Sequence, residues 1–454
     1  MYQFLYQSIQ QSICSGRIAP NEKLPSKRSL AKHLNISVIT VENAYAQLLL
    51  EGYLYSVEAK GYYVQPLETM SSRQEDAPVL KEAEIQEHEF FVDFKANCTN
   101  LSHFPAHTWA RLMRNVLSSH EKELYKGMPY NGVHKLRQAI RDYLYQFRGM
   151  DVSPAQIIVG AGTEYLYSRL IQLLGNDNIF ALEDPGYHKF ADIAANYRMD
   201  SEYIPIDDSG LSVEKLREGN ANIVHVSTSN HFPTGIIMPI KRRQELMAWA
   251  LEDSGRYIIE DDYDCELRYT GRMIRPMYSV DVHQKVIYMN TFSKSLVPSI
   301  RISYMVLPEH LVHRYVETMS FYYCTVSSFE QYTLAEFISQ HYFERHINRL
   351  KNYYKTHRNL LLTEFQNSSL KDMIHIREQN AGTHFLLYVN TTMSKEEISR
   401  AALEQDIHLA FLSDYCHTPI VDMDRTIVIN YAGIEPKHVK EAIRRMEKIF
   451  LTAT

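Results

Sequence analysis

Residues 291–304 (TFSKSLVPSIRISY) combine a lysine among hydroxyl side chains with an arginine seven residues later. Lys294 could form a Schiff base with an aldehyde cofactor, because a lysine amine held partly desolvated is neutral and nucleophilic. Arg301 could bind the phosphate of such a cofactor through its planar, permanently charged guanidinium. Short motifs match by chance, and the same residues fit a surface lysine in a loop before a buried strand. Other residues must decide between the two interpretations.

Short apolar runs alternate with helical segments beyond residue 90. They cover residues 156–159, 179–182, 222–226, 257–259, 286–289 and 301–307. This alternation predicts a mainly parallel sheet with helices on both faces, and therefore an α/β domain over residues 90–454. Ligands collect at the carboxyl ends of parallel strands, so the residues that follow each run are the candidates for chemistry.

The side chains at these positions match the needs of a pyridine aldehyde phosphate. Asp261 would keep the pyridine nitrogen protonated, and Tyr263 would donate to the phenolic oxygen of the ring. Tyr187 would stack on one ring face. The phosphate would be held by Gly162, Thr163, Thr291, Ser293 and Arg301. Taken singly, each of these residues also has an ordinary explanation as part of a turn, a cap or the solvent-exposed surface.

The order D-x-Y at 261–263, S-K at 293–294 and arginine at 301 resembles the fold-type-I aminotransferases, from about residue 92 to the C-terminus. The resemblance implies pyridoxal 5′-phosphate (PLP) bound as an aldimine at Lys294, and a smaller C-terminal α+β subdomain. In the motif HFPTG at 231–235 the family often has asparagine or glutamine in place of His231. His231 could still bond the ring oxygen, in a tautomer that the sequence leaves open.

Aminotransferases that bind an amino-acid carboxylate usually carry an arginine late in the chain, on a strand of the form aliphatic-Arg-aliphatic. The matching strand spans residues 426–431, and Val428 stands at the arginine position. Arg425 and Lys189 are the alternative contacts for an effector carboxylate. Without a bidentate clamp, oriented binding of an α-amino acid is harder to support, so the sequence favours a sensor over a catalyst.

Residues 1–66 predict three helices and two short aromatic strands. Apolar spacing indicates a helix over 2–14, a second after Pro25 that Ser26 caps and Asn35 ends, and a third that Ser37 opens and Glu51 ends. The last two helices form a helix-turn-helix, and the strands at 53–55 and 61–64 add a wing. A small helical interaction domain has the same apolar spacing and stays the alternative.

If this unit binds DNA, the start of its third helix enters the major groove and basic residues meet the phosphates. The candidate DNA contacts are Lys27, Arg28, Ser37, Val38, Ile39, Thr40 and Lys60. The run KLPSKRSLA at 23–31, SVITV at 37–41 and EGY at 51–53 resemble the GntR-type winged-helix domain of bacterial repressors. That family commonly has an arginine where this chain has Val38, so operator preference does not carry over.

The two halves together are similar to the MocR group of transcriptional regulators. The resemblance implies a regulator that binds double-stranded operator DNA, forms a homodimer, and uses PLP as effector or as coenzyme for an amino compound. Members of the group control vitamin B6 synthesis, GABA use and related amine metabolism. The two halves would be joined by residues 67–89, which are polar and acidic and are typical of a linker.

Composition limits the remaining classes. No run approaches the roughly 18 apolar residues that a membrane helix needs, and the first residues lack the order of a secretion signal, so we expect a cytoplasmic protein without a membrane partner. Five separate cysteines without a C-x-x-C pair predict neither a metal site nor a disulfide framework. The net charge of −6 divides into +2 for residues 1–66, −5 for 67–89 and −3 for the rest, which is typical of parts with separate roles.

Three functions stay open. The first is a regulator whose effector is PLP itself, bound at Lys294. The second is a regulator with permanent PLP that senses an amine or amino acid through an external aldimine. The third is a true aminotransferase that carries a DNA-binding head. Val428 and the winged helix count against the third, so we expect at most vestigial transaminase activity.

Overall fold

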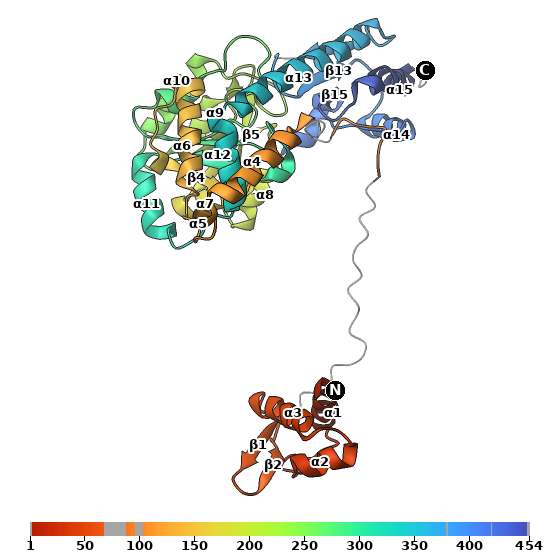
Figure 1. Cartoon of the computed structure of the whole chain (residues 1–454). Helices are drawn as coiled ribbons and strands as arrows, with labels where there is room; N and C mark the ends of the chain where they lie inside the picture. Colours follow the sequence, from red (N-terminus) through yellow and green to blue (C-terminus); the bar gives the residue numbers. More distant parts are fainter. Residues whose placement is uncertain (1, 68–87, 96–102, 378–379, 419, 452–454) are drawn as a thin grey trace. The chain divides into compact units, whose positions relative to one another are not determined.

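The computed structural model describes residues 2–67, 88–95, 103–377, 380–418 and 420–451. The chain divides into two compact units, Met1–Glu87 and His88–Thr454 (Figure 1). Most of the expected acidic linker at 67–89 lies outside the described residues. None of the described helices is both long and apolar enough to cross a membrane.

The N-terminal unit is a winged helix. Its elements are α1 (Tyr2–Cys14), α2 (Lys27–Leu34), α3 (Val38–Leu50), β1 (Leu54–Val57) and β2 (Gly61–Val64). Ser26 and Ser37 cap α2 and α3, since their side chains accept hydrogen bonds from backbone N–H groups in the first turn. Asn35 ends α2 in the left-handed conformation, with φ of 53°. The expected helix-turn-helix with a wing is confirmed.

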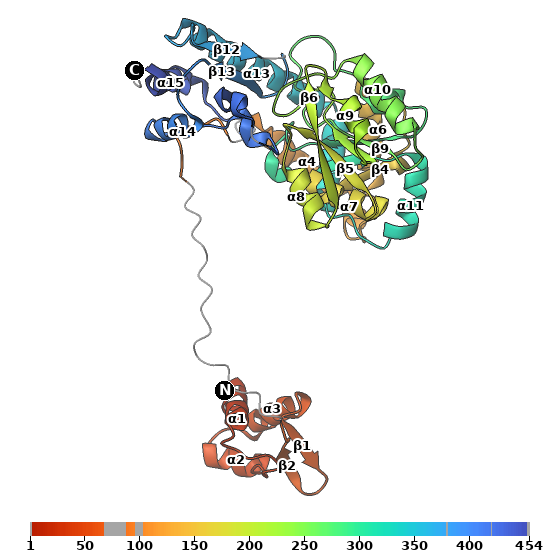
Figure 2. The ribbon, with the colours of Figure 1, turned by 180° about the vertical axis from the view of Figure 1, so that it is seen from behind.

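An eight-stranded sheet forms the centre of the second unit (Figure 2). Its strand order is β4-β11-β10-β9-β8-β5-β6-β7. The bounds are β4 (Ile157–Gly160), β5 (Ile179–Asp184), β6 (Asp200–Asp207), β7 (Gly210–Leu211), β8 (Ile223–Val226), β9 (Tyr257–Asp261), β10 (Val286–Thr291) and β11 (Ser303–Val306). The neighbours from β10 to β6 pair in parallel, whereas β11 and β7 pair antiparallel to theirs. The predicted mainly parallel sheet is confirmed.

Helices cover both faces of this sheet. On β10, Tyr288 packs into one apolar core, whereas its neighbours Ile287 and Met289 pack into another. The helices of the large domain are α4 (Ala106–Ser119), α5 (Glu121–Leu124), α6 (His134–Tyr143), α7 (Thr163–Leu174), α8 (Lys189–Asn196), α9 (Val213–Glu218), α10 (Ile240–Leu251), α11 (Glu309–Met319) and α12 (Ser328–Ser339). Burial on both faces explains why the strands read as continuous apolar runs.

A smaller α+β subdomain follows, as expected. It comprises α13 (Tyr342–Asn367), β12 (Ile374–Arg377), β13 (His384–Val389), α14 (Lys395–Glu404), β14 (Ile407–His408), β15 (Thr426–Asn430) and α15 (Val439–Leu451). Strands β12, β13 and β15 form an antiparallel sheet, while β14 pairs in parallel with β3 (Val92–Asp93). Ile427 and Ile429 face the core of the subdomain, and Val428 between them faces the other side.

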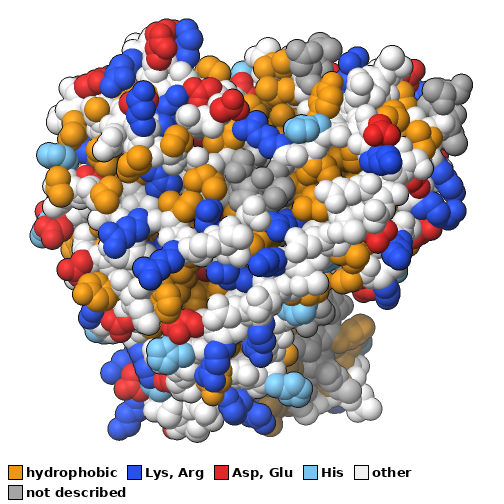
Figure 3. All heavy atoms as spheres, turned by 90° about the horizontal axis from the view of Figure 1, so that it is seen from above, with side chains coloured by type: hydrophobic (Ala, Val, Ile, Leu, Met, Phe, Trp, Pro, Cys, Tyr) orange, Lys and Arg blue, Asp and Glu red, His pale blue; other side chains and the backbone are white. Residues whose placement is uncertain are grey.

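Acidic, basic and hydrophobic side chains are intermixed on the face seen in Figure 3. That face therefore presents no surface of a single charge.

Candidate functional site

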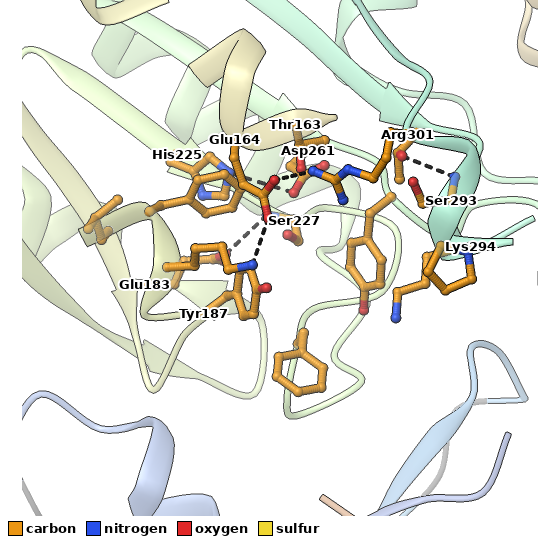
Figure 4. A pocket seen from close by; sticks show the side chains of 17 residues that line it. Thr163, Glu164, Glu183, Tyr187, His225, Ser227, Asp261, Ser293, Lys294 and Arg301 are labelled. Carbon is orange, nitrogen blue, oxygen red and sulfur yellow. Dashed lines mark hydrogen bonds and ion pairs between the residues drawn. The ribbon is translucent and has the colours of Figure 1, made fainter. Parts of the chain in front are cut away.

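A cavity of about 240 Å³ lies at the carboxyl ends of the parallel strands of the large domain (Figure 4). Strand β9 ends in Asp261 and β10 ends in Thr291, while α7 begins with Thr163 just after β4. The cavity is lined by Thr163, Glu164, Leu182, Glu183, Tyr187, Lys189, Phe190, His225, Ser227, Phe232, Asp261, Tyr263, Thr291, Ser293, Lys294, Pro298 and Arg301. Residues far apart in sequence thus meet where an open parallel sheet usually binds its ligand.

Eight of the ten expected cofactor contacts line this cavity. They are Thr163, Tyr187, Asp261, Tyr263, Thr291, Ser293, Lys294 and Arg301. The other two, Gly162 and His231, lie outside the lining. His231 is 1% exposed, its Nδ1 lies 2.7 Å from the Thr234 hydroxyl, and its Nε2 lies 3.5 Å from a Glu183 carboxylate oxygen. His231 Nδ1 is therefore paired within the protein, whereas its Nε2 is buried without a hydrogen-bond partner among the described atoms.

Gly162 precedes the cavity residue Thr163 in the turn that opens α7, and its backbone conformation favours glycine. Its φ is +98°, and a Cβ at this position would meet the guanidinium of Arg301. The guanidinium therefore lies directly against the turn that opens α7. The N-terminus of a helix and an arginine together provide the donors that a phosphate needs.

The segment around Lys294 is held by hydroxyl groups. The Thr291 hydroxyl oxygen accepts hydrogen bonds from the Ser293 backbone N–H at 3.1 Å and from the Ser303 hydroxyl at 2.8 Å. Lys294 itself is half-buried. Arg301 has left-handed φ of +48° after the 3-10 turn Pro298–Ile300, a conformation that non-glycine residues seldom adopt. This turn places Lys294 and Arg301 on the same cavity.

Asp261 is a buried carboxylate at the end of β9. Burial first, and then the neighbouring carboxylates of Asp262 and Asp264, raise the pKa of Asp261 to about 8. Its Oδ2 lies 3.8 Å from His225 Nε2. Burial likewise raises the pKa of Tyr263 well above its usual value, so the phenol stays a donor.

PLP fits this set of side chains. Among the described atoms, Asp261 Oδ1 and Ser293 Oγ are buried and have no hydrogen-bond partner. Buried polar atoms of this kind normally have partners, so both point to a polar ligand. A carboxylate could bind the pyridine nitrogen, and the hydroxyl with Arg301 and Thr163 could bind the phosphate. The bound group would supply an electron-withdrawing ring and an aldehyde for the Lys294 amine.

Two buried residues of the cavity were missed by the sequence interpretation. Glu183 on β5 accepts a hydrogen bond from the Ser227 backbone N–H at 3.0 Å, and burial raises its pKa to about 8. Burial lowers the pKa of His225 on β8 to about 3, so its imidazole is neutral beside Asp261. Both residues lie in or directly after predicted strands. The sequence showed that both residues lie at predicted strands, but it did not show toward which face of the sheet each side chain points.

Glu164 also lines the cavity, and the sequence left open whether it contacts the cofactor. One of its carboxylate oxygens pairs with Arg301, and the other lies 2.6 Å from Lys189 Nζ. Glu164 directly follows Thr163 in the sequence, which indicates proximity to the phosphate turn, but the sequence did not show which cations it would meet.

Of the two candidate contacts for an effector carboxylate, Arg425 and Lys189, only Lys189 lines the cavity. Val428 is fully buried in an apolar cluster with Leu386, Ala410 and Leu412. Arg425 is exposed at the end of a 3-10 turn and does not line the cavity. Lys189 does line it, paired with Glu164.

The candidate DNA contacts lie on α2, at the start of α3 and between the two strands of the wing. Val38 and Ile39 at the start of α3 are 43% and 68% exposed. Arg28 and Lys60 are also exposed, while Lys27 pairs with Glu42 at 2.6 Å. The Ser37 hydroxyl caps α3 and lies 2.8 Å from the Thr40 hydroxyl.

Lys23, which the sequence interpretation left out, joins Lys27 and Lys60 around a hollow of about 450 Å³. Three lysines around one hollow at the start of α2 are a suitable surface for nucleic-acid phosphates.

Each of the two units matches a known protein family. Residues 1–64 match the bacterial regulatory proteins of the gntR family, and residues 93–446 match aminotransferase class I and II. A multiple substrate aminotransferase from Thermococcus profundus is 21% identical, with a TM-score of 0.71 over 84% of this chain and 97% of that structure. The fold and site thus define a helix-turn-helix protein with a PLP-dependent aminotransferase fold.

Relatives share this whole organisation. The HTH-type transcriptional regulator YdeL of Bacillus subtilis is 38% identical over 98% of this chain and 96% of the relative. The probable rhizopine catabolism regulatory protein MocR of Rhizobium meliloti is 30% identical over 99% and 94%. The pyridoxine biosynthesis regulator PdxR of Corynebacterium glutamicum is 28% identical over 88% and 87%. The chain belongs to this MocR family of HTH-type transcriptional regulators.

Proposed function

We propose that this chain binds operator DNA through its winged helix and senses PLP through Lys294, as part of the control of vitamin B6 metabolism in the cytoplasm. The observation that carries the proposal is the meeting of Lys294, Asp261 and Arg301 on one cavity. An amine, a buried carboxylate and a guanidinium are the groups that the aldehyde, ring nitrogen and phosphate of PLP require. The relative named for pyridoxine biosynthesis supports vitamin B6 as the regulated metabolism.

The surroundings of Val428 support sensing over transamination. Its apolar neighbours leave β15 without a cation for an amino-acid carboxylate. A second candidate function keeps PLP permanently bound and senses an amine or amino acid. Lys189 favours that candidate, because its ammonium lines the cavity and a carboxylate could bind there.

Titration with PLP tests the proposed binding site. Wild-type protein should gain the visible absorbance of lysine-bound PLP, and Lys294→Ala should not, because alanine has no amine to attach the aldehyde. Lys437→Ala, which removes an exposed lysine of the C-terminal subdomain, is the matched control and should behave as wild type. Retention of the absorbance in Lys294→Ala would contradict the assignment.

DNA binding separates the candidate functions. Fluorescence anisotropy with operator DNA should change when PLP alone is added. A change that needs an amino compound in addition to PLP would instead support the second candidate. Turnover of an amino donor and a keto acid at roughly 1–1,000 per second would support an aminotransferase.

We further propose that the protein acts as a homodimer. Tyr125, Phe321 and Tyr323 are 75%, 71% and 72% exposed, and Tyr323 lies against Gly127. Exposed aromatic groups of this size are common at protein interfaces, and a symmetric dimer would match two operator half-sites. Sedimentation should show a dimer for the wild type and a monomer for Phe321→Glu. An unchanged mass for Phe321→Glu would show that the dimer interface does not depend on Phe321.

A further inference from the structure

Glu164 lies between the two cations that face the cavity beside α7 (Figure 4). One carboxylate oxygen pairs with Arg301, and the other lies 2.6 Å from Lys189 Nζ. The carboxylate therefore holds both cations at once. Glu164 itself belongs to the first turn of α7, next to Thr163.

Charge near this turn decides how strongly it binds a phosphate. Arg301, Lys189 and the N-terminus of α7 would together present a strongly positive site. The negative charge of the Glu164 carboxylate offsets one of these positive charges. Burial raises the pKa of its carboxyl, but the contacts with Lys189 and Arg301 outweigh burial, so the pKa lies below its usual value and the group is ionised at neutral pH.

The phosphate turn and Glu164 share the same guanidinium. A Cβ on Gly162 would meet the guanidinium of Arg301, so Arg301 lies against the turn. The same guanidinium pairs with the Glu164 carboxylate. A phosphate bound at the turn and Arg301 would therefore displace this carboxylate or lie next to it, and two anions in contact repel each other.

We propose that Glu164 is a built-in competitor of the cofactor phosphate and sets a moderate affinity of the cavity for PLP. Moderate affinity lets occupancy follow the concentration of PLP, which a sensor requires and a permanent coenzyme does not. The proposal rests on the proposed function in one respect, namely that PLP places its phosphate on Arg301. Glu164 is then the residue that sets the affinity of the sensor for PLP.

The test titrates full-length wild type and Glu164→Gln with PLP and with pyridoxal, which lacks the phosphate, by visible absorbance. Glu164→Gln should bind PLP about tenfold more tightly, because one negative charge beside the phosphate is lost. Its affinity for pyridoxal should stay within about twofold of wild type, and the gain for PLP should shrink as salt is raised. Inorganic phosphate should also compete with PLP at lower concentration in the variant.

Glu252→Gln is the matched control. Glu252 also pairs with two arginines, Arg217 and Arg256, but it does not line the cavity. Its replacement should leave the affinity for PLP unchanged.

Three results would overturn the proposal. They are unchanged or weaker PLP binding by Glu164→Gln, an equal gain for pyridoxal, and failure of both Glu164→Gln and Glu164→Ala to fold by circular dichroism. The third would make Glu164 a structural tie between α7 and its neighbours. If neither wild type nor variant binds PLP, the proposed function fails as well. If both bind PLP and operator DNA ignores it, the proposed function fails while the result for Glu164 stands.

Discussion

At the scale of one residue, the buried carboxyl of Asp261 is suited to bind a cationic ring nitrogen. A buried carboxylate is costly unless hydrogen bonds or a positive charge compensate it. The Asp261 carboxyl has one oxygen without a partner among the described atoms and a neutral imidazole 3.8 Å from the other. A protonated pyridine nitrogen would supply the missing donor and charge.

Replacement of Asp261 should separate cofactor binding from folding. Asp261→Asn should weaken PLP binding about tenfold or more, since a hydrogen bond to a charged group contributes roughly 1.5–3 kcal/mol. Thermal stability without added PLP should change little at neutral pH, because burial raises the pKa of Asp261 to about 8, so that the carboxyl and the asparagine amide are both largely neutral there. Absorbance titration and differential scanning fluorimetry measure the two effects. Asp208→Asn, at a highly exposed position, should change neither, and unaltered PLP affinity in Asp261→Asn would contradict the role.

At the scale of elements, β15 shows how strand alternation assigns neighbouring side chains to opposite sides of the C-terminal sheet. Ile427 and Ile429 belong to the core of the subdomain, so Val428 must face the opposite way. There it contacts an apolar cluster that includes Leu386 and Leu412. The strand is built for packing at the position where amino-acid aminotransferases place a cation.

An arginine introduced at this point of β15 should destabilise the subdomain. Val428→Arg should lower the free energy of unfolding by about 3 kcal/mol or more, because an unpaired charge would be buried among apolar side chains. Urea denaturation measures the loss. Tyr388→Arg on the neighbouring strand β13 is the control at a 38% exposed position, and its effect should be below about 1 kcal/mol. Equal stability of Val428→Arg and wild type would show that the cluster accommodates a cation.

Arg28 on helix α2 is a basic residue that we expect to contribute to DNA binding more than to folding. Arg28→Ala should weaken binding to all DNA sequences alike and reduce the slope of log affinity against log salt by about 1, as loss of one phosphate contact requires. Its thermal stability should match wild type, because Arg28 is exposed. Anisotropy at several salt concentrations provides the measurement. Arg17→Ala, in the exposed turn after α1, is the control, and an unchanged salt slope for Arg28→Ala would favour an interaction domain.

At the scale of the whole molecule, several ionisable groups are buried in the large domain without full neutralisation. Burial is the main cause that raises the pKa of Glu183 and Asp261 to about 8 and that of Asp264 to about 7. Burial lowers the pKa of His225 and His231 to about 3. The folded domain therefore favours neutral forms of both acids and bases.

Stability should fall as pH rises from about 6.5 to 8.5. Unfolded carboxyls lose their protons near pH 4, whereas the three raised carboxyls keep theirs until pH 7–8, so the folded state binds more protons over this range. Their contribution is full below pH 4 and is lost as pH rises through the folded pKa values. The lowered histidines oppose this trend only below about pH 6.5.

Urea denaturation followed by tryptophan fluorescence measures this dependence, because Trp109 and Trp249 both lie in the second unit. Glu183→Gln should flatten the decline, and Glu214→Gln on the surface should not. Constant stability between pH 6.5 and 8.5 would mean that the buried carboxyls are already ionised.

Much of the architecture could be read from local patterns. Serine caps, Asn35 and apolar spacing predicted α2 and α3 because a helix end has unsatisfied N–H and C=O groups that few residue types satisfy locally. Apolar runs predicted the strands of the large sheet because strands buried on both faces have no polar alternation. The candidate site could be predicted to the extent that its residues follow strand ends, as Asp261 and Thr291 do.

By itself, the sequence determined the two folds and supplied candidate residues for the chemistry, because each depends on local spacing or on a motif within a few residues. Tertiary structure alone decided which of these side chains share a cavity and what they pair with. It turned His231 toward Glu183 and Thr234, and it set Glu164 between Lys189 and Arg301. Such contacts join distant strand ends and helix starts, and their directions follow from sheet register and burial, which local spacing does not encode.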